Sequence, residues 1–144
     1  MIKETINKLI SELPATVKLV AVSKFHPFEA IEEAYQAGQR IFAESRPQEL
    51  LAKVKRLEEI RIERGEPDYM SDIEWHFIGH LQTNKVKYII DSVKLIQSVD
   101  SIKLALEIDR LSEKSSKITD VLCEVNIGGE ESKFGFTPES IGET

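Results

Sequence analysis

Polar residues follow directly after several short apolar runs of the chain. The runs are rich in β-branched side chains, and the residues just beyond them are Lys24, Glu44, Ser45, Gly79, His80, Asp100 and Asn126. In parallel α/β folds, ligands bind at the carboxyl ends of the strands. If the apolar runs are parallel strands, these polar groups converge at one edge of a sheet, and the sequence predicts a ligand site there.

Lys24 is the member of this set with the clearest chemistry. Strand alternation places Val20, Val22 and Lys24 on one face, and if that face lines a barrel, the amine points into an enclosed, partly apolar space. Desolvation in such a space lowers the pKa of a lysine and yields a neutral amine that can attack a carbonyl and form a Schiff base. A solvated lysine at the end of a strand is the alternative, and position alone favours it.

Other reactive side chains give weaker signals. His76 and His80 are four residues apart, but the Phe-Ile-Gly between them is typical of a strand end, so they are not expected to share a helical face as in zinc-protease helices. Cys123 alternates with Glu124 inside an apolar run and is expected to be a packed thiol. Trp75 is expected in the core. We therefore predict neither a metal site nor a catalytic cysteine.

The elements that would position these residues alternate regularly. Apolar runs predict strands at 17–23, 40–44, 75–79, 93–99 and 120–126, and helical periodicity appears at 2–13, 27–38, 47–64, 83–90 and 101–117. Strand–helix alternation indicates parallel strands joined by right-handed crossovers, and hence an α/β fold. The continuous apolar character of the runs is typical of strands that are covered on both faces.

Composition limits the class of protein. The chain has 144 residues, a net charge of −6, 41% hydrophobic residues and one cysteine. This length predicts one domain over 1–144, and the chain is too apolar to be disordered. No apolar stretch approaches the roughly 20 residues that span a bilayer. Without a signal peptide at the start or a disulfide framework, we expect a cytoplasmic chain with no membrane partner.

Charge also argues against nucleic acid as a partner, because phosphate binding normally needs a cationic field. The basic cluster of Lys53, Lys55 and Arg56 is interleaved with glutamates inside the predicted helix 47–64. We expect this cluster to be a solvated helix face with i,i+4 pairing rather than a nucleic-acid site.

Five segments resemble one known family, the pyridoxal-phosphate homeostasis proteins, which are related to the N-terminal barrel domain of alanine racemase. The segments are AVSKFHPFEAIEEAYQAG (21–38), RIFAESRPQE (40–49), WHFIGHLQTNK (75–85), IQSVDS (96–101) and CEVNIGGEESKFGF (123–136). The resemblance implies a TIM-type (β/α)8 barrel that holds pyridoxal 5′-phosphate (PLP) as a Schiff base on Lys24. It further implies a protein that binds PLP and delivers it to PLP-requiring apo-enzymes, without catalysis of its own.

The resemblance also assigns cofactor contacts. Ser45 stands where the family commonly has asparagine, and His80, directly after Gly79, stands where proline is common. Asn126 and Lys133 match positions near the cofactor mouth, and a plain surface lysine is the alternative for Lys133. A PLP-dependent racemase or decarboxylase is a second functional interpretation, which needs an acid/base facing the lysine. A fragment or scaffold without functional PLP binding is a third.

Length is the main departure from the family. A complete barrel takes about 250 residues, and barrel phosphate sites use the loops after strands seven and eight. The chain stops soon after its fifth predicted strand, so the family's phosphate-binding elements lie outside it, and we expect weaker PLP affinity. Five strands cannot close a barrel, which leaves Val20 and Val22 facing solvent. We expect a partial barrel that self-associates; a doubly wound open sheet and a partly ordered chain are the alternatives.

Overall fold

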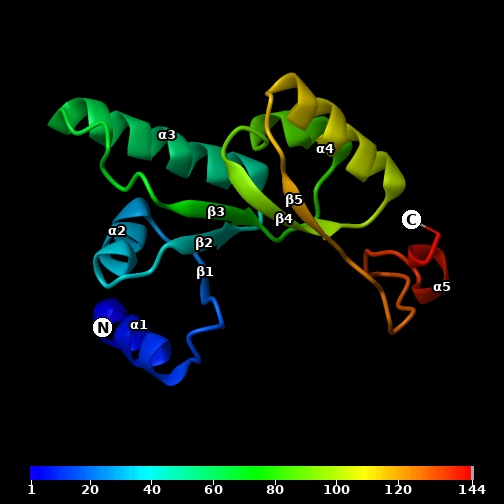
Figure 1. Cartoon of the computed structure of the whole chain (residues 1–144), viewed down its shortest axis with the longest axis horizontal. Coiled ribbons are helices and arrows are strands. Elements are labelled where there is room, and N and C mark those ends of the chain that lie inside the picture. Colours follow the sequence, from blue (N-terminus) through cyan, green and yellow to red (C-terminus); the bar gives the residue numbers. More distant parts are fainter. Residues whose placement is uncertain (144) are drawn as a thin grey trace.

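A computed structural model describes residues 1–143, in which strands and helices alternate along the chain (Figure 1). The strands are β1 (Val20–Val22), β2 (Ile41–Glu44), β3 (Glu74–Phe77), β4 (Val93–Val99) and β5 (Asp120–Cys123). The helices are α1 (Ile2–Glu12), α2 (Phe28–Gln36), α3 (Pro47–Arg64), the 3-10 helix η1 (Thr83–Tyr88), α4 (Ile102–Lys114) and α5 (Pro138–Ile141).

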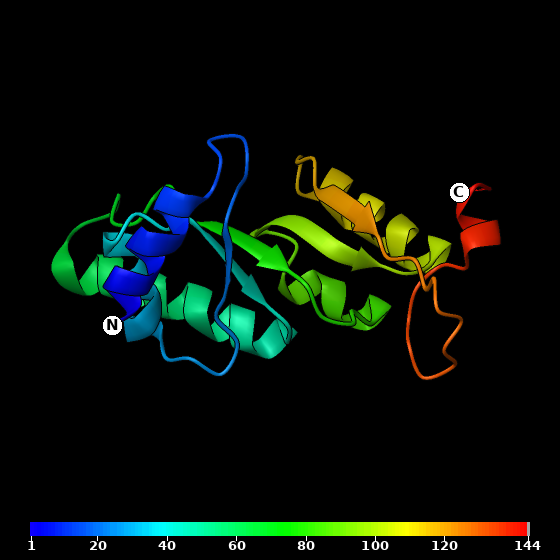
Figure 2. The same cartoon turned by 90° about the horizontal axis from the view of Figure 1, so that it is seen from below.

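The five strands form one parallel sheet in which every strand pairs with its neighbours in chain order. A doubly wound sheet reverses its strand order at a switch point, whereas the wall of a barrel does not. The order β1-β2-β3-β4-β5 therefore confirms the predicted α/β fold and the partial barrel, and the doubly wound alternative is wrong. The two ends of the chain lie at opposite ends of the long axis (Figures 1 and 2).

Local sequence signals set the bounds of the longest helices. Helix α3 has Pro47 in its first turn, where the missing N–H costs nothing, and it ends at Gly65, whose φ of 66° forms a left-handed cap. Helix α4 begins after Ser101, whose side chain accepts a hydrogen bond from the Leu104 N–H. The predicted range 47–64 is confirmed, and α4 is shorter than predicted.

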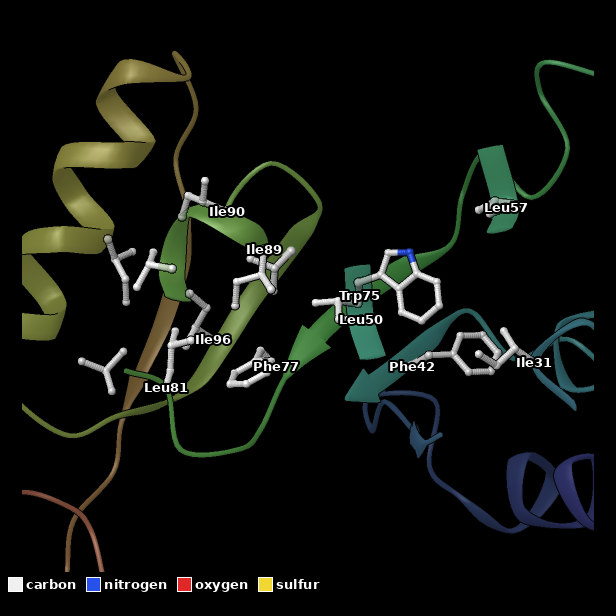
Figure 3. Close-up of a cluster of buried hydrophobic side chains, with 14 of the residues drawn as sticks. Ile31, Phe42, Leu50, Leu57, Trp75, Phe77, Leu81, Ile89, Ile90 and Ile96 are labelled. Carbon is white, nitrogen blue, oxygen red and sulfur yellow. The ribbon is translucent and has the colours of Figure 1, made fainter. Parts of the chain in front are cut away.

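One face of the sheet packs against the helices and forms the core. Phe42 of β2 and Trp75 of β3 are neighbours in register, with ring centroids 6.1 Å apart. Figure 3 shows Phe42 pointing toward Ile31 of α2, while Trp75 lies close to Leu50 of α3. The prediction that Trp75 lies in the core is confirmed. On the opposite face, Val22 is exposed, as expected for an open barrel.

Several predicted boundaries and environments are wrong. Strand β1 covers only three residues of 17–23, and β5 ends at Cys123. Within the predicted helix 83–90, residues Thr83–Tyr88 form a 3-10 helix. Cys123 is exposed rather than packed, because every residue of the edge strand β5 is exposed. The short helix α5 was not predicted. Among the described residues, no helix is long and apolar enough to cross a membrane.

Candidate functional site

The residues that follow the strands lie along one edge of the sheet, which we call the carboxyl edge. Because all five strands are parallel and adjacent, their carboxyl ends point the same way. Ser23 and Lys24 follow β1, Ser45 follows β2, and Gly79 and His80 follow β3. Asp100 follows β4, and Asn126 lies three residues beyond β5.

Lys24 is exposed at this edge. Its ammonium lies 5.9 Å from the centroid of the Phe25 ring, and Phe25 is itself exposed. The enclosed, partly apolar surroundings expected for the amine are therefore wrong for the described residues. The reason is tertiary: desolvation needs a second wall across the face that carries Val22, and that face is open.

Under Lys24 lies a buried ionic cluster that sequence reasoning missed. Lys53 of α3 is paired with Glu44 at the end of β2, and their side chains are 8% and 0% exposed. The Lys53 ammonium also donates to the Ser23 carbonyl at 2.7 Å, and the Ser23 hydroxyl donates to Glu44 Oε1 at 2.6 Å. The expectation of a solvated face is thus wrong for Lys53. Its spacing from Leu50 and Leu57 puts it on the buried stripe of the helix and could have revealed this.

Glu49 joins the cluster to the residue after Lys24. Its carboxylate accepts a hydrogen bond from the Phe25 N–H at 2.5 Å and one from Lys53 at 3.1 Å. Desolvation alone would raise the pKa of Glu49, but the Phe25 N–H and the Lys53 ammonium outweigh it. The net result is a pKa of Glu49 below its ordinary value, so the carboxylate is held ionised.

The ends of β2 and β3 approach each other closely. A Cβ on Gly79 would lie 2.1 Å from the backbone oxygen of Ser45, so only glycine fits there. The Gly79 carbonyl accepts a hydrogen bond of 2.6 Å from the Ser98 hydroxyl of β4. The structure therefore brings the expected site residues Ser45 and Gly79 together through their backbones.

His80 is held by two contacts at the same edge. Its Nδ1 lies 3.2 Å from the Asp100 carboxylate, and its ring stacks on Phe134 with centroids 3.7 Å apart and an interplanar angle of 12°. The hydrogen bond at Nδ1 orients the imidazole ring, and the second ring nitrogen, Nε2, takes no part in that bond. Phe134 was not among the expected site residues, because it follows β5 by eleven positions and only the fold brings it to His80.

The last two expected site residues belong to the segment after β5. The Asn126 side chain donates to the Glu130 carbonyl at 2.8 Å, and so it stabilises the turn of its own segment. Lys133 is exposed in the same segment. Among residues 1–143, no contact joins Asn126 or Lys133 to Lys24, and the segment after β5 reaches the rest of the expected set through the stacking of Phe134 on His80.

Comparison with known proteins gives matches that run over nearly the whole chain. The profile of the family described as alanine racemase, N-terminal domain, matches residues 1–144. A pyridoxal phosphate homeostasis protein of Aquifex aeolicus is 45% identical over 126 residues, which are 88% of this chain and 50% of that protein. One of Synechocystis is 38% identical over 135 residues, which are 94% of this chain and 57% of that protein. The chain thus spans about half the length of the curated relatives it matches.

Solved structures agree with these sequence matches. PipY of Synechococcus elongatus, solved without PLP, is 37% identical with a TM-score of 0.85, covering 98% of this chain and 61% of PipY. The structure of PipY with PLP bound gives a TM-score of 0.81 at 35% identity, covering 99% and 63%. Alanine racemase of E. faecalis, at 17% identity and a TM-score of 0.68, shares the fold over 99% of this chain and 36% of its own.

Proposed function

This chain belongs to the alanine racemase N-terminal domain family, and we propose that it binds PLP through a Schiff base on Lys24, without catalysis of its own. The observation that carries the proposal is the superposition of 99% of the chain on PipY with PLP bound. Lys24, exposed at the carboxyl edge, is the only lysine within two residues of the carboxyl end of a strand in the described sheet.

The residues of the carboxyl edge suit an aldehyde with polar ring substituents. Lys24 would hold the cofactor by a carbon–nitrogen double bond between its side-chain nitrogen and the aldehyde carbon, with the aldehyde oxygen released as water. Ser45, at the edge beside Gly79, offers a hydroxyl, and His80 offers a ring nitrogen. We also assign cofactor contacts to Asn126 and Lys133 of the segment after β5, whose Phe134 packs on His80 at this edge. PLP itself supplies the electron-withdrawing ring.

The partners follow from the same proposal. The relatives are named for PLP homeostasis, which supports delivery of PLP to apo-enzymes, and we place this role in the cytoplasm.

We also propose self-association of the domain over 1–144 through the open face of the sheet, where Val22 and Leu122 are exposed. Light scattering after size exclusion checks this: a monomer at high concentration contradicts the self-association.

One experiment tests the Schiff base. PLP is added, absorbance is recorded, borohydride reduces the product, and mass spectrometry maps the adduct. We expect the adduct on Lys24 and its loss in Lys24→Ala. The matched control is Lys87→Ala, because Lys87 is also exposed and its ammonium lies 5.2 Å from the ring centroid of Tyr88. Adducts scattered over surface lysines and unchanged in Lys24→Ala would support the fragment without functional binding.

The His80–Asp100 pair favours a second candidate, a PLP-dependent racemase or decarboxylase. A histidine oriented by a carboxylate is a common general acid/base, and this one lies at the same edge as Lys24. Incubating the PLP-loaded chain with L-alanine distinguishes the two. Appearance of D-alanine or CO2, lost in His80→Gln, supports the enzyme; unchanged L-alanine supports the carrier.

A further inference from the structure

We propose that Glu49 and Lys53 of α3 are positioning residues for Lys24, because they hold the two residues that flank it. This inference rests on the proposed binding of an aldehyde by Lys24 and adds how its amine is placed. A lysine side chain is a flexible four-carbon stem, so the protein limits the position of the amine chiefly by fixing the backbone that carries it.

Ser23, on the N-terminal side of Lys24, is fixed at every polar atom. Its N–H donates to the Ala43 carbonyl at 3.0 Å, and its carbonyl accepts from Lys53. Its hydroxyl donates to the fully buried Glu44. Lys53 therefore holds the peptide bond that leads directly into Lys24.

Phe25, on the C-terminal side, has a φ of 65° although it is not glycine. Such a conformation persists only where the surroundings enforce it, and it concentrates at functional sites. The surroundings here are the Glu49 carboxylate on the Phe25 N–H and the Arg46 guanidinium 4.7 Å from the ring centroid. Packing does not enforce it, because Phe25 is 68% exposed.

Glu49, which binds the Phe25 N–H, and Lys53, which binds the Ser23 carbonyl, also bind each other, because they lie one turn apart on α3. Lys53 occupies the buried stripe between Leu50 and Leu57, where an apolar side chain would serve packing equally well. A buried ion pair adds little net stability over apolar packing, and its best-attested use is to specify one arrangement. The arrangement specified here is the Ser23–Phe25 turn at the carboxyl edge.

The test separates positioning from folding. Glu49→Ala removes the acceptor for the Phe25 N–H, whereas Glu49→Gln keeps an oxygen acceptor. Glu107→Ala is the matched control for loss of an ion-paired helix glutamate: the Glu107 side chain is 27% exposed, against 21% for Glu49, and it accepts a hydrogen bond from Arg110 within α4. Two quantities are measured: amide hydrogen exchange of Phe25 without PLP, and the rate of PLP labelling at Lys24 relative to that at the exposed Lys87.

We expect Glu49→Ala to speed exchange of the Phe25 amide and to lower the relative labelling rate at Lys24 about tenfold or more. We expect Glu49→Gln to restore most of the slow Phe25 exchange and of the Lys24 labelling rate, and Glu107→Ala to change neither quantity. Fast exchange at Phe25 in the unsubstituted chain, or unchanged Lys24 labelling in Glu49→Ala, overturns the positioning role alone. Absence of Lys24 labelling in the unsubstituted chain overturns the proposed function, and the positioning of an aldehyde-binding amine with it.

Discussion

Replacing Lys53 with methionine tests how much the buried cluster contributes to stability. Methionine resembles the lysine stem in length and keeps its apolar packing, so the main loss is the ammonium. Glu44, which is 0% exposed, would then keep only the Ser23 hydroxyl as a hydrogen-bond donor. Its Oε2 already lacks a hydrogen-bond partner among the described residues. Lys53→Met thus leaves a buried carboxylate without a counter-charge.

Removing one member of a buried ion pair typically costs about 3–5 kcal/mol. We expect Lys53→Met to lower the free energy of unfolding by about that amount, a large share of the ~5–15 kcal/mol of a typical domain. The reverse change, Glu44→Met, is expected to cost less, about 1–3 kcal/mol, because Lys53 still has Glu49 and the Ser23 carbonyl. The double variant contains neither buried charge and is expected within about 1 kcal/mol of the unsubstituted chain.

Denaturant unfolding followed by the fluorescence of Trp75 measures these values. Trp75 is the one tryptophan of the sequence and is buried beside Phe42, so its emission reports the core next to the cluster. The refuting result is additivity: if the cost of the double variant equals the sum of the two single costs, the pair is not coupled. A cost below about 1 kcal/mol for Lys53→Met would also contradict the argument, since it would resemble an exposed pair.

Three further changes have defined outcomes. Gly79→Ala puts a Cβ 2.1 Å from the Ser45 oxygen and is expected to cost about 1–3 kcal/mol in chemical denaturation. Phe42→Ala, which empties the core beside Ile31, is expected to cost about 3–5 kcal/mol by the same assay. The lowered pKa of Glu49 gives stability that is present above about pH 4.3 and lost as pH falls through the folded-state pKa, so Glu49→Gln should flatten that part of an acid titration. An unaltered acid profile in Glu49→Gln would contradict this.

The sequence by itself determined the order and type of the main elements. Apolar runs and helical stripes are local patterns, and they predicted all five strands and the bounds of α3. Alternation then required parallel strands, and the polar residues after each run predicted the carboxyl edge. These predictions succeeded because each depends on residues within one element and its cap.

Only the tertiary structure decided the environments at that edge. Whether Lys24 is enclosed depends on what lies across the open face, and whether Cys123 is packed depends on a neighbour for the edge strand β5. The pairing of Lys53 with Glu44 required the end of β2 to lie against α3, and these two residues are nine positions apart in the chain. The hydrophobic pattern of an element predicts which of its faces points to the core. The pairing of charges between two elements depends on how those elements pack together, and so only the tertiary structure shows it.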